Sequence, residues 1–135
     1  MFQFSSHIAL LLIATALTTG RFNVSRADDD AFFEAQIRPL LIERCYKCHS
    51  GKKTNGGLAL DTRSGWQKGG ENGPAIIPGK PDESLLIQAI KYESLEMPPQ
   101  DAGGKLSAAE IAAVTKWVQS GAPDPREEVS QLGGM

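Results

Sequence analysis

Two cysteines and a histidine, Cys45, Cys48 and His49, form the most informative pattern in this 135-residue sequence. Two thiols at this spacing, followed at once by a histidine, are typical of a site where haem c is attached covalently. The thiols can add to the two vinyl groups of a haem, and the adjacent imidazole can then bind the iron. The chain has no other cysteine, and its second histidine, His7, lies in an apparent export signal. We therefore predict one covalent haem c per chain.

Three simpler interpretations of the cysteine pair compete with haem. A closed structural zinc site needs four ligands, usually sulfur or imidazole, and Cys45, Cys48 and His49 exhaust those atoms in the mature chain. A disulfide between Cys45 and Cys48 would close a very short loop and stabilise little. A redox dithiol of the thioredoxin type needs a strand before the motif, whereas a helical pattern precedes it here. A haem-free dithiol module nevertheless stays open as an alternative.

Met97 is the candidate for the second iron ligand. An electron-transfer haem usually takes Met or a second His at that position, and no second His remains in the mature chain. The other methionines are Met1, in the apparent signal, and Met135, the last residue. Two prolines follow Met97 and restrict the backbone that carries its thioether. The alternative is a methionine that only fills space in the core.

Other residues are expected around the haem motif. Leu58 and Leu60 alternate in a short run and are candidates to face the haem. Arg63 and Trp66 can donate hydrogen bonds to its propionates, although surface or core packing explains them equally well. The long loop from Gly69 to Pro81 is expected to supply a carbonyl that accepts a hydrogen bond from the His49 ring.

Hydrophobic periodicity predicts an all-α fold with three main helices and long loops. The first runs from Asp30 to Arg44, with a kink or a restart near Pro39. The second runs from Asp82 to Tyr92, capped by Asp82 or Ser84. The third opens with the capping box Ser107-Ala-Ala-Glu and ends near Gly121.

Trp117, on the third predicted helix, is expected to pack against the first helix at Phe33. The residues from Asp124 to Met135 are polar and are expected to form a mobile tail. Residues 28–125 are the predicted domain and residues 126–135 a flexible tail.

Residues 1–27 resemble a secretory signal. Ile8–Leu17 is apolar apart from Thr15 and is short for a membrane span, and small residues precede Asp28. The segment before it has no Lys or Arg, so an uncleaved membrane anchor stays open. Export suits the haem hypothesis, because bacteria attach c-type haem outside the cytoplasm. We therefore expect a periplasmic or equivalent location.

The charge balance narrows the classes of partner. The formal net charge is −2, and loss of residues 1–27 removes two basic residues and no acidic one, so the mature chain carries −4. A mildly acidic chain argues against nucleic acid as a partner. We expect redox proteins as partners and no small-molecule substrate, with membrane contact only if the signal is retained.

Several short runs, taken with the haem motif, resemble the planctomycete-type cytochrome c domain of the broad class I cytochrome c group. The runs are Ile37–Leu41, Gly56–Asp61, Gly73–Ile76, Pro78–Pro81, Ser84–Leu86, Glu96–Pro99 and Trp117 with Gly121–Pro123. The resemblance covers residues 31–125. It implies covalent haem c, His49 and Met97 as axial ligands, and the mainly helical class I fold.

The predicted function is one-electron transfer by an exported monohaem cytochrome, without catalysis of its own. One alternative is a haem enzyme or gas-sensing module in which Met97 can be displaced. Family members usually carry large further domains after this one. The chain is therefore expected to be either a free-standing carrier or the N-terminal cytochrome fragment of a larger protein.

Overall fold

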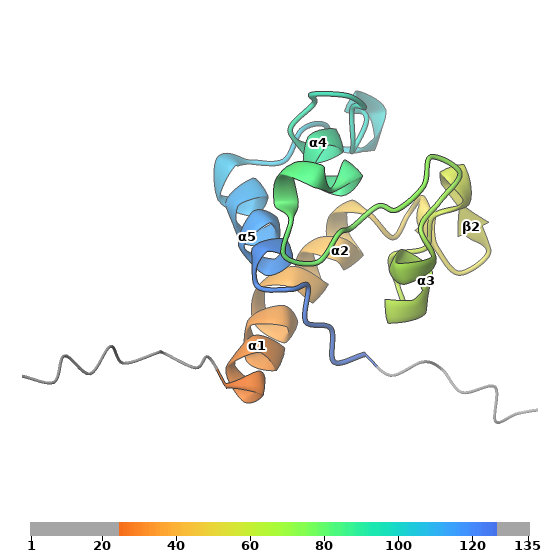
Figure 1. The fold of residues 1–135 in the computed structure, drawn as a ribbon. Coiled ribbons are helices and arrows are strands. Elements are labelled where there is room, and N and C mark those ends of the chain that lie inside the picture. Colours follow the sequence, from red (N-terminus) through yellow and green to blue (C-terminus); the bar gives the residue numbers. More distant parts are fainter. Residues whose placement is uncertain (1–24, 127–135) are drawn as a thin grey trace, which may run out of the picture.

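The computed structural model describes residues 25–126, so all but the end of the predicted signal lies outside the described residues. The described chain is rich in helix and contains little strand, in agreement with the predicted all-α class (Figure 1). Among residues 25–126, no helix is both long enough and apolar enough to cross a membrane.

The N-terminal helical rod runs continuously from Arg26 to Arg44. Its segments are α1 (Arg26–Phe32), the π-helical η1 (Phe33–Ile37) and α2 (Arg38–Arg44). Ser25 caps it through a capping box, so the rod begins earlier than the predicted Asp30. Pro39 lies in the first turn of α2, where its missing N–H costs little. The rod therefore neither breaks nor restarts at Pro39. The predicted irregularity appears as a wider π-helical turn directly before α2.

The remaining elements are short except for the last helix. They are β1 (His49–Ser50), β2 (Lys53–Thr54), η2 (Asn55–Gly57), α3 (Arg63–Lys68), η3 (Pro81–Glu83), α4 (Leu85–Ile90), η4 (Gln100–Ala102) and α5 (Ala108–Gln119). β1 and β2 form a minimal antiparallel pair, with His49 opposite Thr54 and Ser50 opposite Lys53. The sequence analysis missed α3, which Thr62 caps by accepting a hydrogen bond from the Gly65 N–H at 3.0 Å.

The second predicted helix is shorter than expected. Its first residues form η3, and α4 begins only at Leu85. Ser84 occupies the cap position, but its hydroxyl makes no capping bond. It is fully buried, donates to the Lys80 carbonyl at 2.8 Å and accepts from the Ile77 N–H at 2.9 Å. Ser84 therefore ties the preceding loop to α4 instead of capping the helix.

α5 packs against both η1 and α4 and so joins the two halves of the core (Figure 1). Its predicted capping box between Ser107 and Glu110 is present. Trp117 is fully buried, and its ring lies 5.7 Å from that of Phe33, which confirms the predicted contact. Its indole N–H donates to the Pro123 carbonyl at 2.8 Å. Trp66 meets Trp117 edge to face at 6.1 Å.

The end of the described chain corrects the prediction of a mobile tail from Asp124 onward. Asp124 and Arg126 are buried and form an ion pair, which we call the C-terminal clasp. Arg126 Nη1 donates to the Tyr46 hydroxyl and to the Leu60 carbonyl, each at 2.7 Å. The Trp66 indole N–H donates to Asp124 at 2.9 Å. Asp124 and Arg126, which the sequence analysis placed in a mobile tail, therefore bind this part of the chain to the core. Residues 127–135 lie outside the described part.

The clasp favours the charged form of both partners. Burial opposes ionisation of Asp124, but hydrogen bonds from Arg126 and Trp66 outweigh it, so the pKa of Asp124 lies below its ordinary value. Burial likewise opposes the charge on Arg126, and its bonds to Asp124 raise the pKa of Arg126 in spite of it. The pair therefore stays ionised at neutral pH.

We predict that Asp124→Asn lowers the free energy of unfolding at neutral pH by about 3 kcal/mol, because it leaves a buried guanidinium without its counter-charge. A depressed carboxyl pKa contributes stability above its unfolded value of 3.8, and that stability is lost as pH falls through the lower folded pKa. The gap between wild type and Asp124→Asn should therefore narrow on acidification. Urea unfolding of the full chain, followed by circular dichroism, measures it.

The matched control is Glu34→Gln, which removes the carboxylate of the exposed Glu34–Arg38 pair. Because both side chains are close to half exposed, its effect should stay below about 0.5 kcal/mol. If Asp124→Asn lowers the free energy of unfolding no more than the control does, or by an amount that does not change with pH, Asp124 does not stabilise the fold as a buried, charged partner of Arg126.

Candidate haem c site

The turn that follows α2 carries the two thiols. Cys45 ends the helix, with its N–H bonded to the Leu41 carbonyl at 2.9 Å. The next turn then folds back on Cys45, whose carbonyl accepts from the N–H of Cys48 at 3.2 Å and of His49 at 3.0 Å. Both cysteines are free and half-buried. This tight turn gathers the three predicted residues on one wall of a pocket.

A short extended segment that includes Leu58 and Leu60 holds His49 in place. Its Nδ1 lies 3.2 Å from the Leu58 carbonyl, and its own carbonyl accepts from the Leu60 N–H at 2.7 Å. A carbonyl can only accept, so Nδ1 carries the proton in this bond and Nε2 keeps its lone pair. The predicted carbonyl from the Gly69–Pro81 loop is therefore wrong, because the hairpin after the motif brings Leu58 to the ring first.

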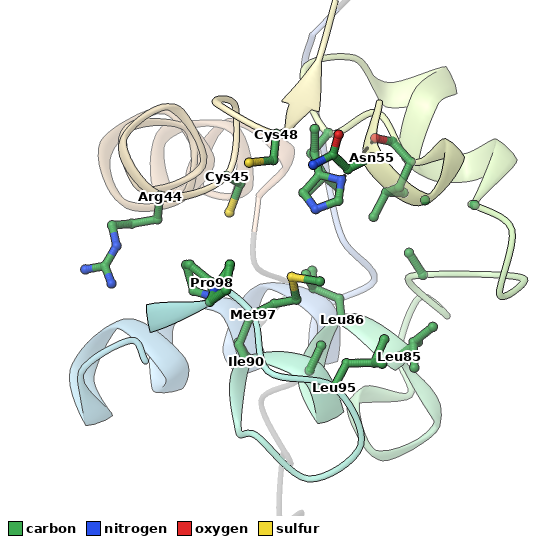
Figure 2. Close-up of a pocket in the computed structure, with 18 of the residues that line it drawn as sticks. Arg44, Cys45, Cys48, Asn55, Leu85, Leu86, Ile90, Leu95, Met97 and Pro98 are labelled. Atoms are coloured by element: carbon green, nitrogen blue, oxygen red, sulfur yellow. Dashed lines mark hydrogen bonds between the residues drawn. The ribbon is translucent and has the colours of Figure 1, made fainter. Parts of the chain in front are cut away.

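The opposite wall is built from α4 and the loop that follows it. In Figure 2, Cys45 and Cys48 point into the pocket from one side, and Met97, Leu86 and Ile90 face them from the other. The Met97 N–H donates to the Ala89 carbonyl at 3.2 Å, which fastens the loop to α4. Met97 is half-buried and lines the same pocket as the two cysteines and His49.

The pocket between the walls has a volume of about 1070 Å³, including the part open to solvent. Its lining is mostly apolar and includes Leu58 and Leu60, the two residues expected to face the haem. Asn55 and Asn72, which the sequence analysis did not single out, are exposed polar residues of the lining. A large, mainly apolar pocket with few polar groups is typical of a cofactor site.

Arg63 and Trp66, the candidate propionate partners, are not part of the pocket lining. Trp66 is buried in the core, and its indole N–H is used by Asp124. Arg63 donates to the Asp124 backbone carbonyl at 3.3 Å. Both therefore serve the C-terminal clasp, and the core-packing alternative is the correct one for Trp66.

The Cys45 thiol is poorly suited to redox chemistry of its own. Its burial raises the pKa of Cys45 to about 11, and the neighbouring Arg44 charge only partly offsets this. Reactive dithiols instead depend on a lowered thiol pKa, since the thiolate is the nucleophile. The environment of Cys45 therefore does not favour the dithiol alternative.

Arg44 connects the two walls and was not identified from the sequence. It directly precedes Cys45, and its Nη2 donates to the carbonyls of Gly103 at 3.2 Å and Gly104 at 2.9 Å. Both glycines lie beyond the methionine loop, by which we mean residues 93–99, between Tyr92 and η4. Its Nη1 lies 3.5 Å from the Glu110 carboxylate on α5. One guanidinium therefore joins the end of α2 to the segment that follows the methionine loop.

Comparison with protein families agrees with this geometry. Residues 45–101, from the first cysteine of the motif to just past the methionine loop, match the family model described as Planctomycete cytochrome C. Over this stretch the chain is similar to that family. The matched range is narrower than the predicted resemblance over residues 31–125. No curated protein and no solved structure matches the chain.

A cytochrome c domain implies covalently bound haem c, and it points to a c-type cytochrome that carries electrons. The residues of the pocket fit that group. Two free thiols and an imidazole with an available Nε2 lie on one wall, and the lining is mainly apolar. These are the donor types that haem c requires from a protein.

We predict that Arg44→Gln destabilises the haem-attached protein by about 1–2 kcal/mol, because the bonds to Gly103 and Gly104 and the Glu110 pairing are weakened together. Thermal unfolding measures the loss. Arg38→Gln, which removes an exposed guanidinium from the same helix, should change stability by less than about 0.5 kcal/mol. Equal effects of the two variants would show that Arg44 does not join the walls.

Proposed function

We propose that this chain is an exported monohaem cytochrome that transfers one electron at a time through a haem iron ligated by His49 and Met97. One observation carries the proposal. The thiols of the haem motif lie across an apolar pocket from Met97, and His49 lines the same pocket, although Met97 comes from a distant part of the chain (Figure 2).

Each of these residues has a role that its surroundings support. Cys45 and Cys48 would hold the group through two thioethers. His49 presents Nε2, because the bond from Nδ1 to Leu58 fixes both its tautomer and its ring. Met97 offers a neutral sulfur from a loop that is fastened to α4. When bound, haem c supplies an iron that alternates between the ferric and ferrous states.

The apolar lining has a part in this function as well. It makes the surroundings of the pocket mainly apolar, and the dielectric and solvent exposure around a haem are among the means by which a protein sets its potential. Ligands on both faces would leave no open position for a substrate. Together these features favour a carrier over a haem enzyme or gas sensor.

Export and partners are proposed from the sequence alone. The apolar run within residues 1–27 supports export to the periplasm or an equivalent compartment. Redox proteins are the proposed partners, either as separate molecules or as further domains of a larger polypeptide.

We predict that the protein exported from a host able to attach haem c keeps its c-type spectrum after acid–acetone extraction. Oxidised, it should also show the weak red-edge band of sulfur-to-iron charge transfer. Met97→Ala should abolish that band while the haem stays attached. Optical spectra of the oxidised and reduced forms measure both features.

Two further variants separate ligation from packing. Met97→Leu keeps an apolar side chain of similar size and should also lose the band, because it has no sulfur. Met135→Leu should keep it. Haem attached without the band in wild type would favour an open or substituted iron site, and a protein without haem would overturn the proposal.

A further inference from the structure

Tyr92 lies just beyond the end of α4 in a backbone conformation that non-glycine residues seldom adopt. Its φ is +64°, and its N–H donates to the Ala89 carbonyl at 3.1 Å, which closes the helix. Glycine is the usual residue at such a helix end, because a side chain there is strained. A tyrosine in this place suggests that its side chain makes a contact that a glycine would lose.

The Tyr92 side chain reaches the methionine loop. Its hydroxyl donates to the carbonyl of Pro98, the residue that directly follows Met97. The ring is half-buried, and the Lys105 ammonium lies 5.5 Å from its centre. Pro98 itself is buried and lines the pocket. The hydroxyl therefore fixes the backbone immediately after Met97.

Met97 is consequently anchored on both sides by α4 and the residues that end it. Its own N–H is bonded to Ala89, and the carbonyl of the next residue is bonded to the Tyr92 hydroxyl. We propose that Tyr92 is the positioning residue that keeps the Met97 thioether directed into the pocket and so opposes its replacement by other ligands. This inference rests on the proposed function, in which Met97 binds the iron.

Met97 and an added ligand would compete for the same position on the iron. An added ligand can replace Met97 only if the methionine segment moves, and this movement breaks the Tyr92–Pro98 hydrogen bond. Without the hydroxyl, the free energy needed to break this hydrogen bond no longer opposes the replacement of Met97. A typical net hydrogen bond corresponds to a two- to tenfold change in an equilibrium constant, so the apparent affinity for the competing ligand should rise by about that factor.

Imidazole, titrated into the ferric haem-attached full chain while the red-edge band is followed, tests this. Tyr92→Phe removes only a hydroxyl from a ring that keeps its packing, and it should bind imidazole about two- to tenfold more tightly than wild type. The control is Thr115→Val, which removes a hydroxyl bonded to the Ile111 carbonyl at 2.7 Å within α5. Its imidazole affinity should equal that of wild type.

Three other results would contradict the inference, and they can be told apart from one another. If wild type shows the band and Tyr92→Phe binds imidazole no more tightly, Tyr92 does not position Met97, and the proposed function stands. If both variants gain affinity equally, the effect is general loss of stability and the inference fails. If wild type lacks the band, the Met97 ligation in the proposed function fails and the inference fails with it.

Discussion

The contact between Trp117 and Phe33 sets the distance between the two walls of the pocket. Phe33 belongs to the rod whose end delivers Cys45, and Trp117 belongs to α5, which also packs on α4. Both side chains are fully buried, so neither can move without opening the core. The proposed haem site, with thiols and imidazole on one side and the Met97 thioether on the other, would depend on this fixed spacing.

Polar contacts then hold the irregular segments against that core. Arg44 joins the end of α2 to Gly103 and Gly104, and Arg126 joins the chain end to Tyr46 and Leu60. Loops of this kind bury little apolar surface, so specific hydrogen bonds take a large share in positioning them. Tyr46 lies between the two cysteines, which makes the C-terminal clasp a direct support of the haem motif.

The sequence predicts the parts of this molecule that depend on local chemistry. The capping box at Ser107 acts within a single turn, and apolar periodicity along one helix indicates which side chains it buries. The haem motif is equally local, because a short turn is enough to bring Cys45, Cys48 and His49 together. Met97 became the candidate iron ligand by elimination, since Met1 lies in the apparent signal and Met135 is the last residue.

The mistaken expectations about side-chain contacts have three sources: a short hairpin, a partner far away in the sequence, and a side chain with two plausible uses. Leu58 reaches the His49 ring because a minimal hairpin folds back, a geometry that two-residue strands do not reveal in advance. Arg126 looked like the start of a polar tail because its partner Tyr46 is 80 positions away. Ser84 occupies a cap position, yet its hydroxyl stabilises the preceding loop.

The central claim is that both thiols of the motif hold one haem, and intact-protein mass spectrometry under denaturing conditions tests it most directly. The account predicts that the exported chain carries the added mass of one haem and offers no thiol to an alkylating reagent. It also predicts that a variant with serine at both positions 45 and 48 has the mass of the bare polypeptide. A wild-type chain at its bare mass, with both thiols alkylated, would contradict the account.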